Sequence, residues 1–208
     1  YTAQINAIEG NLATTLGTCA VMGTASTMAC IAETLGLTLP GTAAIPAVHA
    51  DRLRAAEATG AQALETARLG LTPSRLITEK SVENALRVLL ALGGSTNGIL
   101  HLTAIAGRRG ISIPLRRLNE LSETTPVLIN LKPTGEGYME DFHAAGGMGA
   151  LLRELAPLLH LDCPSVTGES LGERLAAAPG YIDRTIIRAR GEPFEAVGGL
   201  VVLFGNLA

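Results

Sequence analysis

Apolar residues recur at three- and four-residue steps over most of the chain, a spacing that predicts amphipathic α-helices. The pattern is clearest after Thr78, a residue type that caps helices, where Val82, Ala85 and Leu89 fall on one face. The predicted helices cover residues 19–35, 48–69, 78–92, 98–107, 139–145 and 146–159, and a further helix begins near residue 114. The 48–69 helix carries charges on several faces, so we expect it to lie partly on the surface.

Three short apolar runs predict β-strands among these helices. Residues 127–131 and 200–204 are typical of buried strands, and residues 111–113 read as a short entry strand. Helices interrupted by strands place the chain in the α/β class. From Pro179 onward the sequence is rich in turns, which predicts a domain boundary near residues 188–193. The chain opens without methionine and its last predicted strand has no following partner, so we expect a segment of a longer protein.

Composition narrows the class of protein. Hydrophobic residues make up 47% of the 208 residues, enough for a substantial core, and no stretch has the apolar length of a membrane span. Charged residues make up 17%, the net charge is -3 and neither sign forms a long run, so nothing indicates binding to nucleic acid or to a membrane. The start has no signal-peptide pattern, and the three cysteines fit neither a zinc motif nor a disulfide framework. We therefore expect a cytoplasmic protein that acts on a small molecule.

Cys19 is the residue with the most informative surroundings. It stands where the 19–35 helix is predicted to begin, and a helix N-terminus stabilises a thiolate that could bind a metal. The stretch GTCAVMGTASTMAC supplies small residues that leave room for an inorganic cluster. It also supplies the hydroxyl groups of Thr18, Thr24 and Ser26. A lone cysteine in an apolar helix is more often part of the core, which is how Cys30 and Cys163 read, so the residues alone leave both roles open for Cys19.

The glycine-rich stretch GGSTNG, residues 93–98, has two interpretations. Its backbone N–H groups could surround an oxyanion at the start of the next helix, although no phosphate-loop pattern follows. It could equally be a turn between helices, capped by one of its polar residues. These residues are Ser95, Thr96 and Asn97, which we keep as weak candidates for substrate contact.

The remaining polar residues carry weaker signals. Lys132 directly follows a predicted strand, and Glu140 and Asp141 lie in the first turn of a predicted helix, where acids commonly complement the dipole. The four histidines show no mutual spacing of a metal motif, and no Ser, His and Asp arrangement can be assigned. They are His49, His101, His143 and His160.

Three long blocks resemble successive blocks of the dihydroxy-acid and 6-phosphogluconate dehydratase family. The first runs from GTCAVMGTASTMAC to IPAVHADR, and the second is ENALRVLLALGGSTNGILHLTAIA. The third is LKPTGEGYMEDFHAAGGMGALLREL, followed by GGLVVLFGNLA. The stretches GTASTM and LPGTAAIPAV are most similar to the sugar-acid members, the arabinonate and xylonate dehydratases. The resemblance covers nearly the whole chain in order.

The resemblance implies a hydro-lyase that removes water from a 2,3-dihydroxy acid to give a 2-oxo-3-deoxy acid. Family members use an iron–sulfur cluster held by three cysteines and a magnesium ion, and Cys19 falls on the third of these cysteines. The other two cysteines, the magnesium ligands and a modified lysine would precede Tyr1, and the serine base would follow Ala208. The resemblance therefore places no catalytic residue and no magnesium ligand in this segment, and we expect the segment alone to be inactive and to bind neither cofactor tightly.

The resemblance also implies the architecture and the partners. Residues 1–190 correspond to the second part of the helix-rich N-terminal α/β domain, and residues 191–208 to a linker and the first strand of a C-terminal β-barrel domain. Family members are commonly dimers or tetramers. Two alternatives to a sugar-acid dehydratase remain: a dihydroxy-acid dehydratase of branched-chain amino-acid biosynthesis, and a non-catalytic assembly fragment. An anion-binding module built on GGSTNG is a third hypothesis.

Overall fold

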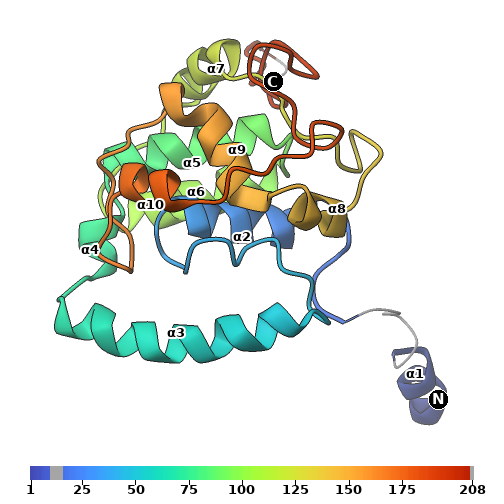
Figure 1. Cartoon of the computed structure of the whole chain (residues 1–208). Coiled ribbons are helices and arrows are strands. Elements are labelled where there is room, and N and C mark those ends of the chain that lie inside the picture. Colours follow the sequence, from blue (N-terminus) through green and yellow to red (C-terminus); the bar gives the residue numbers. More distant parts are fainter. Residues whose placement is uncertain (10–15, 207–208) are drawn as a thin grey trace.

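The structure is a computed structural model that describes residues 1–9 and 16–206, and it is built almost entirely of helices (Figure 1). The first helices are α1 (Thr2–Glu9), α2 (Thr24–Thr34), α3 (Ala50–Arg68), α4 (Pro73–Leu76) and α5 (Glu79–Ala91). They are followed by α6 (Asn97–Gly107), α7 (Leu115–Thr124), α8 (Met139–Ala144), α9 (Gly147–Leu155), the 3-10 turn η1 (Ala156–Leu158) and α10 (Leu171–Ala177). No described helix combines the length and hydropathy required to cross a membrane.

Helix α5 lies at the centre of the fold because its apolar side chains point in several directions. Leu86 and Leu89 pack in one cluster with residues of α2, α6 and α7, whereas Val88 and Leu92 join a second cluster around α8 and α9. Thr78 caps α5 by accepting a hydrogen bond from the Ser81 N–H, while the Ser81 hydroxyl accepts one from the Thr78 N–H. The predicted helices over 78–92, 98–107, 139–145 and 146–159 are thus confirmed with small shifts of their ends.

Helix α3 lies along the outside of the molecule, as the sequence predicts. None of its residues is buried, and Figure 1 shows it running below the main group of helices that contains α2, α5 and α6. Its side chains Gln62 and Thr66 both donate hydrogen bonds to the Val166 carbonyl, at 2.8 and 3.0 Å. Arg52 at its other end donates to the carbonyls of Thr42 and Ile45. Few polar contacts therefore attach this long helix.

The first predicted helix is wrong at its beginning. Helix α2 starts at Thr24 rather than at residue 19, and residues 16–23 form a series of bends. The backbone N–H of Met22 donates to the Lys132 carbonyl at 2.9 Å, and the Ala20 carbonyl accepts from the Met139 N–H at 2.7 Å. Since these groups bond to distant partners, they cannot form the intrahelical ladder.

The predicted strands do not form a sheet within residues 1–9 and 16–206, so the strand part of the α/β assignment is not seen there. Residues 127–131 make isolated bridges, antiparallel between Val127 and Glu195 and between Ile129 and Ile187. The predicted strand is therefore wrong: the segment forms single bridges in place of a continuous ladder. The facing residues turn repeatedly, so only single residues are available for pairing. Residues 111–113 make no bridge, so the short entry strand is also wrong.

The domain division near residue 190 stays a prediction, although residues on both sides of it bond to the same segment. The Arg188 N–H donates to the Leu128 carbonyl at 2.8 Å, and the Phe194 N–H donates to the Val127 carbonyl at 3.0 Å. Ile187 belongs to the second apolar cluster and is fully buried.

The segment 200–204, predicted as a buried strand, has no regular secondary structure and is mostly exposed, with Leu203 at 73% and Phe204 at 56% relative accessibility. Side chains of α7 hold its backbone. The Asn119 amide donates to the Val202 carbonyl at 2.8 Å and accepts from the Val202 N–H at 2.7 Å. The Ser122 hydroxyl donates to the Leu200 carbonyl at 2.7 Å. Here side-chain groups take the place of a neighbouring strand.

Asn119→Ala is expected to release this segment. The substitution removes two hydrogen bonds to Val202, each worth about 1 kcal/mol, so the local opening free energy falls by about 2 kcal/mol. Hydrogen exchange of the Val202 amide should accelerate by more than tenfold. Glu123→Ala on the same helix, where the side chain is exposed, is the control and should leave the exchange rate unchanged. If the Val202 amide exchanged at the same rate in both variants, the two Asn119 hydrogen bonds would not be what holds the segment.

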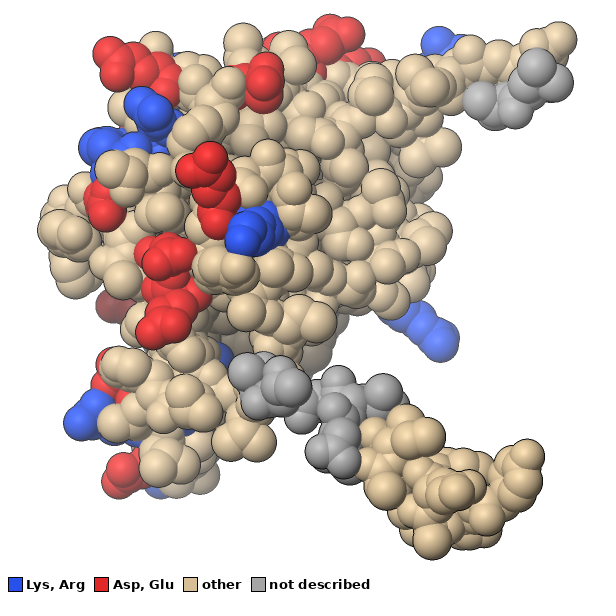
Figure 2. Space-filling view, turned by 90° about the vertical axis from the view of Figure 1, so that its right-hand side faces the viewer, with Lys and Arg blue, Asp and Glu red and all other residues tan. Residues whose placement is uncertain are grey.

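The face of the molecule shown in Figure 2 carries few charges over a wide area, and the acidic and basic groups gather mainly toward one side. Large apolar side chains are also exposed in several elements. Among them are Leu16, Val48, Leu53, Val201 and Leu203, each more than two-thirds exposed.

Candidate functional site

Cys19 lies on a cavity of about 790 Å³ that three separate segments enclose. Residues 16–20 form one wall, residues 42–48 form a second wall, and Met139 and Glu140 at the start of α8 contribute a third. Ala29, Thr38 and Arg52 complete the lining, and the Cys19 thiol is exposed in it beside the small residues Gly17, Thr18 and Ala20. The feature that the sequence singled out is therefore part of a real cavity.

The loop that carries Cys19 is fixed by contacts on both sides. Gly17 has a left-handed backbone (φ 85°), and a Cβ there would lie 2.4 Å from the Cβ of Ala47, so only glycine allows the 42–48 segment to approach. On the other side, the buried Ser26 hydroxyl is 3.0 Å from the Val21 carbonyl and 3.5 Å from that of Cys19. Ser26 thus supports the loop and does not face the cavity.

Cys30 and Cys163 belong to the core, as the sequence predicts, whereas the role of Cys19 as a ligand stays a prediction whose physical reason is corrected. Cys30 and Cys163 are buried, and burial raises the pKa of both thiols, that of Cys163 to about 11. Cys19 alone is exposed. It lies five residues before Thr24, the first residue of α2, so the helix dipole argument does not apply to it. Its accessibility, rather than its helix position, suits it to be a ligand.

A group of polar side chains joins the start of α2 to the start of α6. The Thr24 hydroxyl is 3.2 Å from the Ser95 hydroxyl and accepts a hydrogen bond from the Asn97 amide at 2.9 Å. The Ser95 N–H donates to the buried Thr27 hydroxyl at 3.1 Å. Three candidates from the sequence, Thr24, Ser95 and Asn97, are therefore brought together. Their hydrogen bonds to one another explain their positions without a ligand.

Two other candidates lie apart from this group. Thr96 precedes α6, its side chain is exposed, and it makes no capping hydrogen bond. Thr18 lines the Cys19 cavity, next to the thiol in the chain. Of the hydroxyl candidates, Thr18 is thus the one that lines the cavity.

The glycines of GGSTNG serve helix packing. A Cβ at Gly94 or Gly98 would lie within 2.8 to 2.9 Å of the Leu89 side chain and 2.9 to 3.2 Å of the Thr27 methyl group. The lack of side chains lets α2 pack closely against the α5–α6 turn. This geometry favours the turn interpretation over an anion-binding loop, because the stretch faces another helix of the same chain.

The loop after residue 131 lies beside the residues that precede α2, since the Lys132 carbonyl accepts the hydrogen bond from the Met22 N–H. The Lys132 ammonium group bonds to the Tyr138 hydroxyl at 2.5 Å and lies 4.1 Å from the centre of its ring. Asp141 lies in the first turn of α8 and also accepts a capping hydrogen bond from the Tyr138 N–H at 2.7 Å. Glu140, however, lines the Cys19 cavity, a position the sequence reading missed because it treated both acids as dipole partners. The three blocks of the sequence therefore meet around the first turn of α2.

Glu33 holds the 41–43 segment in place from inside the fold. Its carboxylate is 1% exposed and accepts hydrogen bonds from the N–H groups of Gly41 (2.8 Å) and Ala43 (2.9 Å). Burial raises the pKa of this carboxyl group, although the two N–H groups and the charge of Arg174 oppose the rise. Because the segment continues into the cavity wall, Glu33 positions part of the Cys19 cavity.

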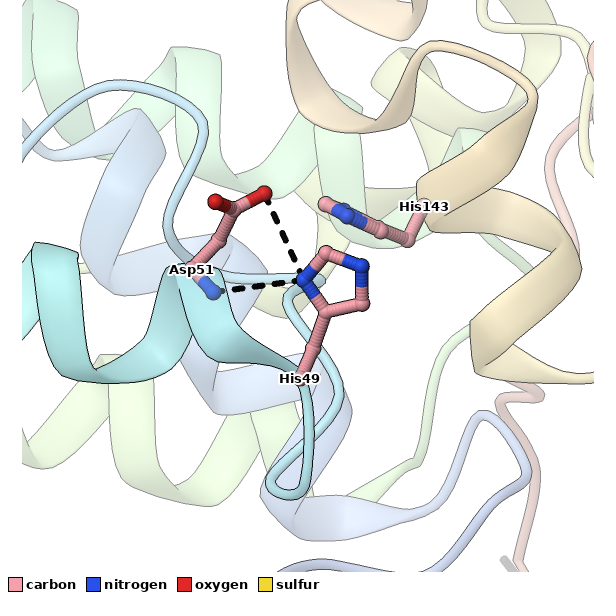
Figure 3. Close-up of side chains that lie close together, drawn as sticks. All are labelled: His49, Asp51 and His143. Atoms are coloured by element: carbon pink, nitrogen blue, oxygen red, sulfur yellow. Dashed lines mark hydrogen bonds and ion pairs between the residues drawn. The ribbon is translucent and has the colours of Figure 1, made fainter.

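A second group of side chains lies nearby, whose atoms are of the kinds that bind metal ions, and it brings together two of the four histidines. His49, Asp51 and His143 each place one ligand atom within 4.8 Å of the others, and Figure 3 shows the side chains turned toward one another. His49 and His143 are separated by more than ninety positions in the sequence, so no motif spacing reveals them. The one local sequence feature that could have indicated the group is the spacing of His49 and Asp51, two positions apart.

The residues of the cavity fit a metal cluster in part. Cys19 offers an exposed thiol, and the cavity of about 790 Å³ leaves space beside it. An iron–sulfur cluster requires several thiolates, and within the described ranges Cys19 is the one thiol on this cavity. The chain thus fits as the source of one ligand among several.

Comparison with known protein families shows to which family the chain belongs. Residues 1–174 match the family described as dihydroxy-acid/6-phosphogluconate dehydratase N-terminal. The chain therefore belongs to this family of dehydratases.

Two of the most similar relatives are named after one of the two enzymes in the family description, dihydroxy-acid dehydratase. The dihydroxy-acid dehydratase of Caldanaerobacter subterraneus subsp. tengcongensis is 45% identical over 207 residues, which are 99% of this chain and 37% of that protein. The dihydroxy-acid dehydratase of Methanococcoides burtonii is 47% identical over 195 residues, 92% of this chain and 35% of that protein. The chain thus spans little more than a third of the length of these relatives.

Proposed function

We propose that this chain forms part of an iron–sulfur, magnesium-dependent dehydratase that converts a 2,3-dihydroxy acid to a 2-oxo acid. The observation that carries the proposal is the match of residues 1–174 to the dehydratase family. Cys19, which the resemblance assigns as a cluster ligand, supports it as the exposed one of the three cysteines.

The proposed reaction breaks two bonds. A base takes the proton from carbon 2, and the electrons of that C–H bond form a double bond to carbon 3 as its hydroxyl leaves and is protonated to water. The resulting enol tautomerises to the 2-oxo acid, so no external oxidant or reductant is needed. When bound, the cluster supplies a Lewis acid for the departing hydroxyl, and magnesium neutralises negative charge on the substrate.

The residues of this chain have a supporting part in that chemistry. Cys19 would hold one iron of the cluster, and its loop is kept in place by Gly17 and Ser26. Glu33 fixes the opposite wall of the cavity through Gly41 and Ala43. The base and the magnesium ligands belong, in this proposal, to other parts of the protein.

For the substrate, the names of the relatives favour the alternative over the sugar acids. The two relatives compared above, and that of Desulfosudis oleivorans at 44% identity, are all named dihydroxy-acid dehydratase. We therefore place the chain with the enzymes that dehydrate branched dihydroxy acids, in place of the sugar-acid assignment. The exposed apolar side chains are available for contact with other parts of the protein or with a second copy, in keeping with a dimer or tetramer.

The proposal is tested with protein expressed anaerobically from the complete gene. We expect formation of a 2-oxo acid from a branched 2,3-dihydroxy acid at a kcat/KM at least tenfold above that for arabinonate or xylonate. The 208-residue chain alone, with one thiol on the cavity, should form no product. The opposite preference would restore the sugar-acid assignment, and no dehydration of either class by cluster-loaded protein would contradict the proposed function.

A further inference from the structure

His49, Asp51 and His143 come together from two elements that are distant in the sequence. His49 is the residue before α3 and Asp51 lies in its first turn, whereas His143 lies in the last turn of α8. The imidazole rings are 5.4 Å apart between centroids and meet edge to face at 68°. The His49 Nδ1 atom is 3.3 Å from an Asp51 carboxylate oxygen (Figure 3).

The donor set is one that transition metals prefer. Two imidazoles and a carboxylate bind Zn²⁺ and related divalent ions, with the remaining positions open to water. Ligand atoms around tetrahedral zinc lie about 3.3 Å apart, given Zn–N distances of about 2.0 to 2.1 Å. The present separations, up to 4.8 Å, are larger by an amount that side-chain rotation can remove. Both His49 and Asp51 have that freedom, since their side chains are 49% and 43% exposed.

The surroundings also suit a bound cation. The ring of His143 makes no hydrogen bond or ion pair within the described residues, so its nitrogens are available as ligands. Arg54 pairs with the Asp51 Oδ1 atom and leaves Oδ2 directed at His49, the arrangement in which an outer partner orients a ligating carboxylate. The guanidinium of Arg52 is occupied by the carbonyls of Thr42 and Ile45.

We propose that His49, Asp51 and His143 bind a divalent transition-metal ion such as Zn²⁺, which fastens the start of α3 to α8. This site is separate from Cys19 and does not depend on the proposed dehydratase function. Its effect on the structure would be local. Helix α3 buries none of its residues, so a metal bridge at its N-terminus would add a strong attachment.

The bridge would also reach the Cys19 cavity. Residues 45–48, which directly precede His49, and Met139 and Glu140, which begin α8, line two of its walls. A metal ion that joins His49 to His143 therefore joins these two walls. The competing explanation needs no metal: His49 caps α3 by accepting from the Asp51 N–H at 3.3 Å and packs against His143.

Calorimetric titration of the metal-stripped chain with Zn²⁺ separates the two explanations. Because zinc also binds thiols, every titration uses the Cys19→Ser background. We expect one equivalent of zinc per chain, and at least about a tenfold loss of affinity in His143→Gln and in His49→Gln. His101→Gln is the matched control, since His101 is exposed on α6 away from the group, and it should bind as the parent does.

Two further measurements distinguish loss of metal binding from loss of folding. Circular dichroism should show equal helix content in all variants, and Asp51→Asn gives a milder change at a partly exposed position. Co²⁺ bound to the parent should give visible d–d absorption bands of a low-symmetry site, which the His143→Gln variant lacks. Absence of zinc binding by the folded parent, or equal affinity in the parent and both histidine variants, would overturn the proposal.

Discussion

If the protein is the iron–sulfur dehydratase proposed above, Cys19→Ser is expected to remove nearly all the iron and sulfide from the protein expressed anaerobically from its complete gene, and with them the dehydratase activity. A serine hydroxyl is a much poorer iron ligand than a thiolate, and a cluster held by three cysteines cannot be retained well by two. Iron and acid-labile sulfide assays, together with the visible absorption of the cluster, measure the loss directly. The structure favours this outcome because the thiol is exposed and lines the cavity.

Cys163→Ala provides the matched control for that experiment. Cys163 is a mostly buried thiol that accepts a hydrogen bond from the Asn84 amide at 3.6 Å, away from the cavity. Its removal should lower stability slightly and leave the iron content unchanged. If Cys19→Ser kept its full iron and sulfide while Cys163→Ala lost them, the assignment of Cys19 as the cluster ligand would be wrong.

The sequence predicted those parts of the fold that local patterns determine. The helix expected over 78–92 is Glu79–Ala91 in the structure, because the Thr78 cap and the repeating apolar face are both local signals. The prediction failed where distant backbone groups compete with the helix. Residues 19–23 have side chains suited to a helix, but the N–H of Met22 bonds to Lys132, more than one hundred residues further along the chain. The strand predicted over 127–131 failed for a different reason, since the segment that faces it offers only single residues for pairing.

The candidate site shows a similar division. Cys19 and its small neighbours stand out in a single stretch, and the polar residues Thr24, Ser95 and Asn97 do meet in space. What brings them together is close packing of α2 against the α5–α6 turn, which no local pattern encodes. The contact between His49 and His143 likewise depends on how α3 meets α8, so sequence spacing could not reveal it.

Glu33→Ala is expected to lower the free energy of unfolding by about 3 to 5 kcal/mol, as removal of one member of a buried charged network does. The substitution leaves the N–H groups of Gly41 and Ala43 without their acceptor. It also removes the carboxylate that faces the buried Arg174 guanidinium. Urea unfolding followed by circular dichroism measures the change. Glu65→Ala on the exposed helix α3, where a surface ion pair with Arg68 is lost, is the control and should cost less than about 1 kcal/mol.

The pH dependence of Glu33→Gln tests the electrostatic part of the argument. Because burial raises the pKa of Glu33 above its ordinary value of 4.5, the folded state holds this proton more tightly than the unfolded state. The contribution of Glu33 to stability is therefore greatest below pH 4.5 and decreases as the pH rises through the folded-state pKa. Glu33→Gln has no titrating group there and should lack this decrease when unfolding is measured at several pH values above 4.5. Parallel pH profiles for the two proteins would mean that the N–H donors and Arg174 fully offset the burial of the carboxylate.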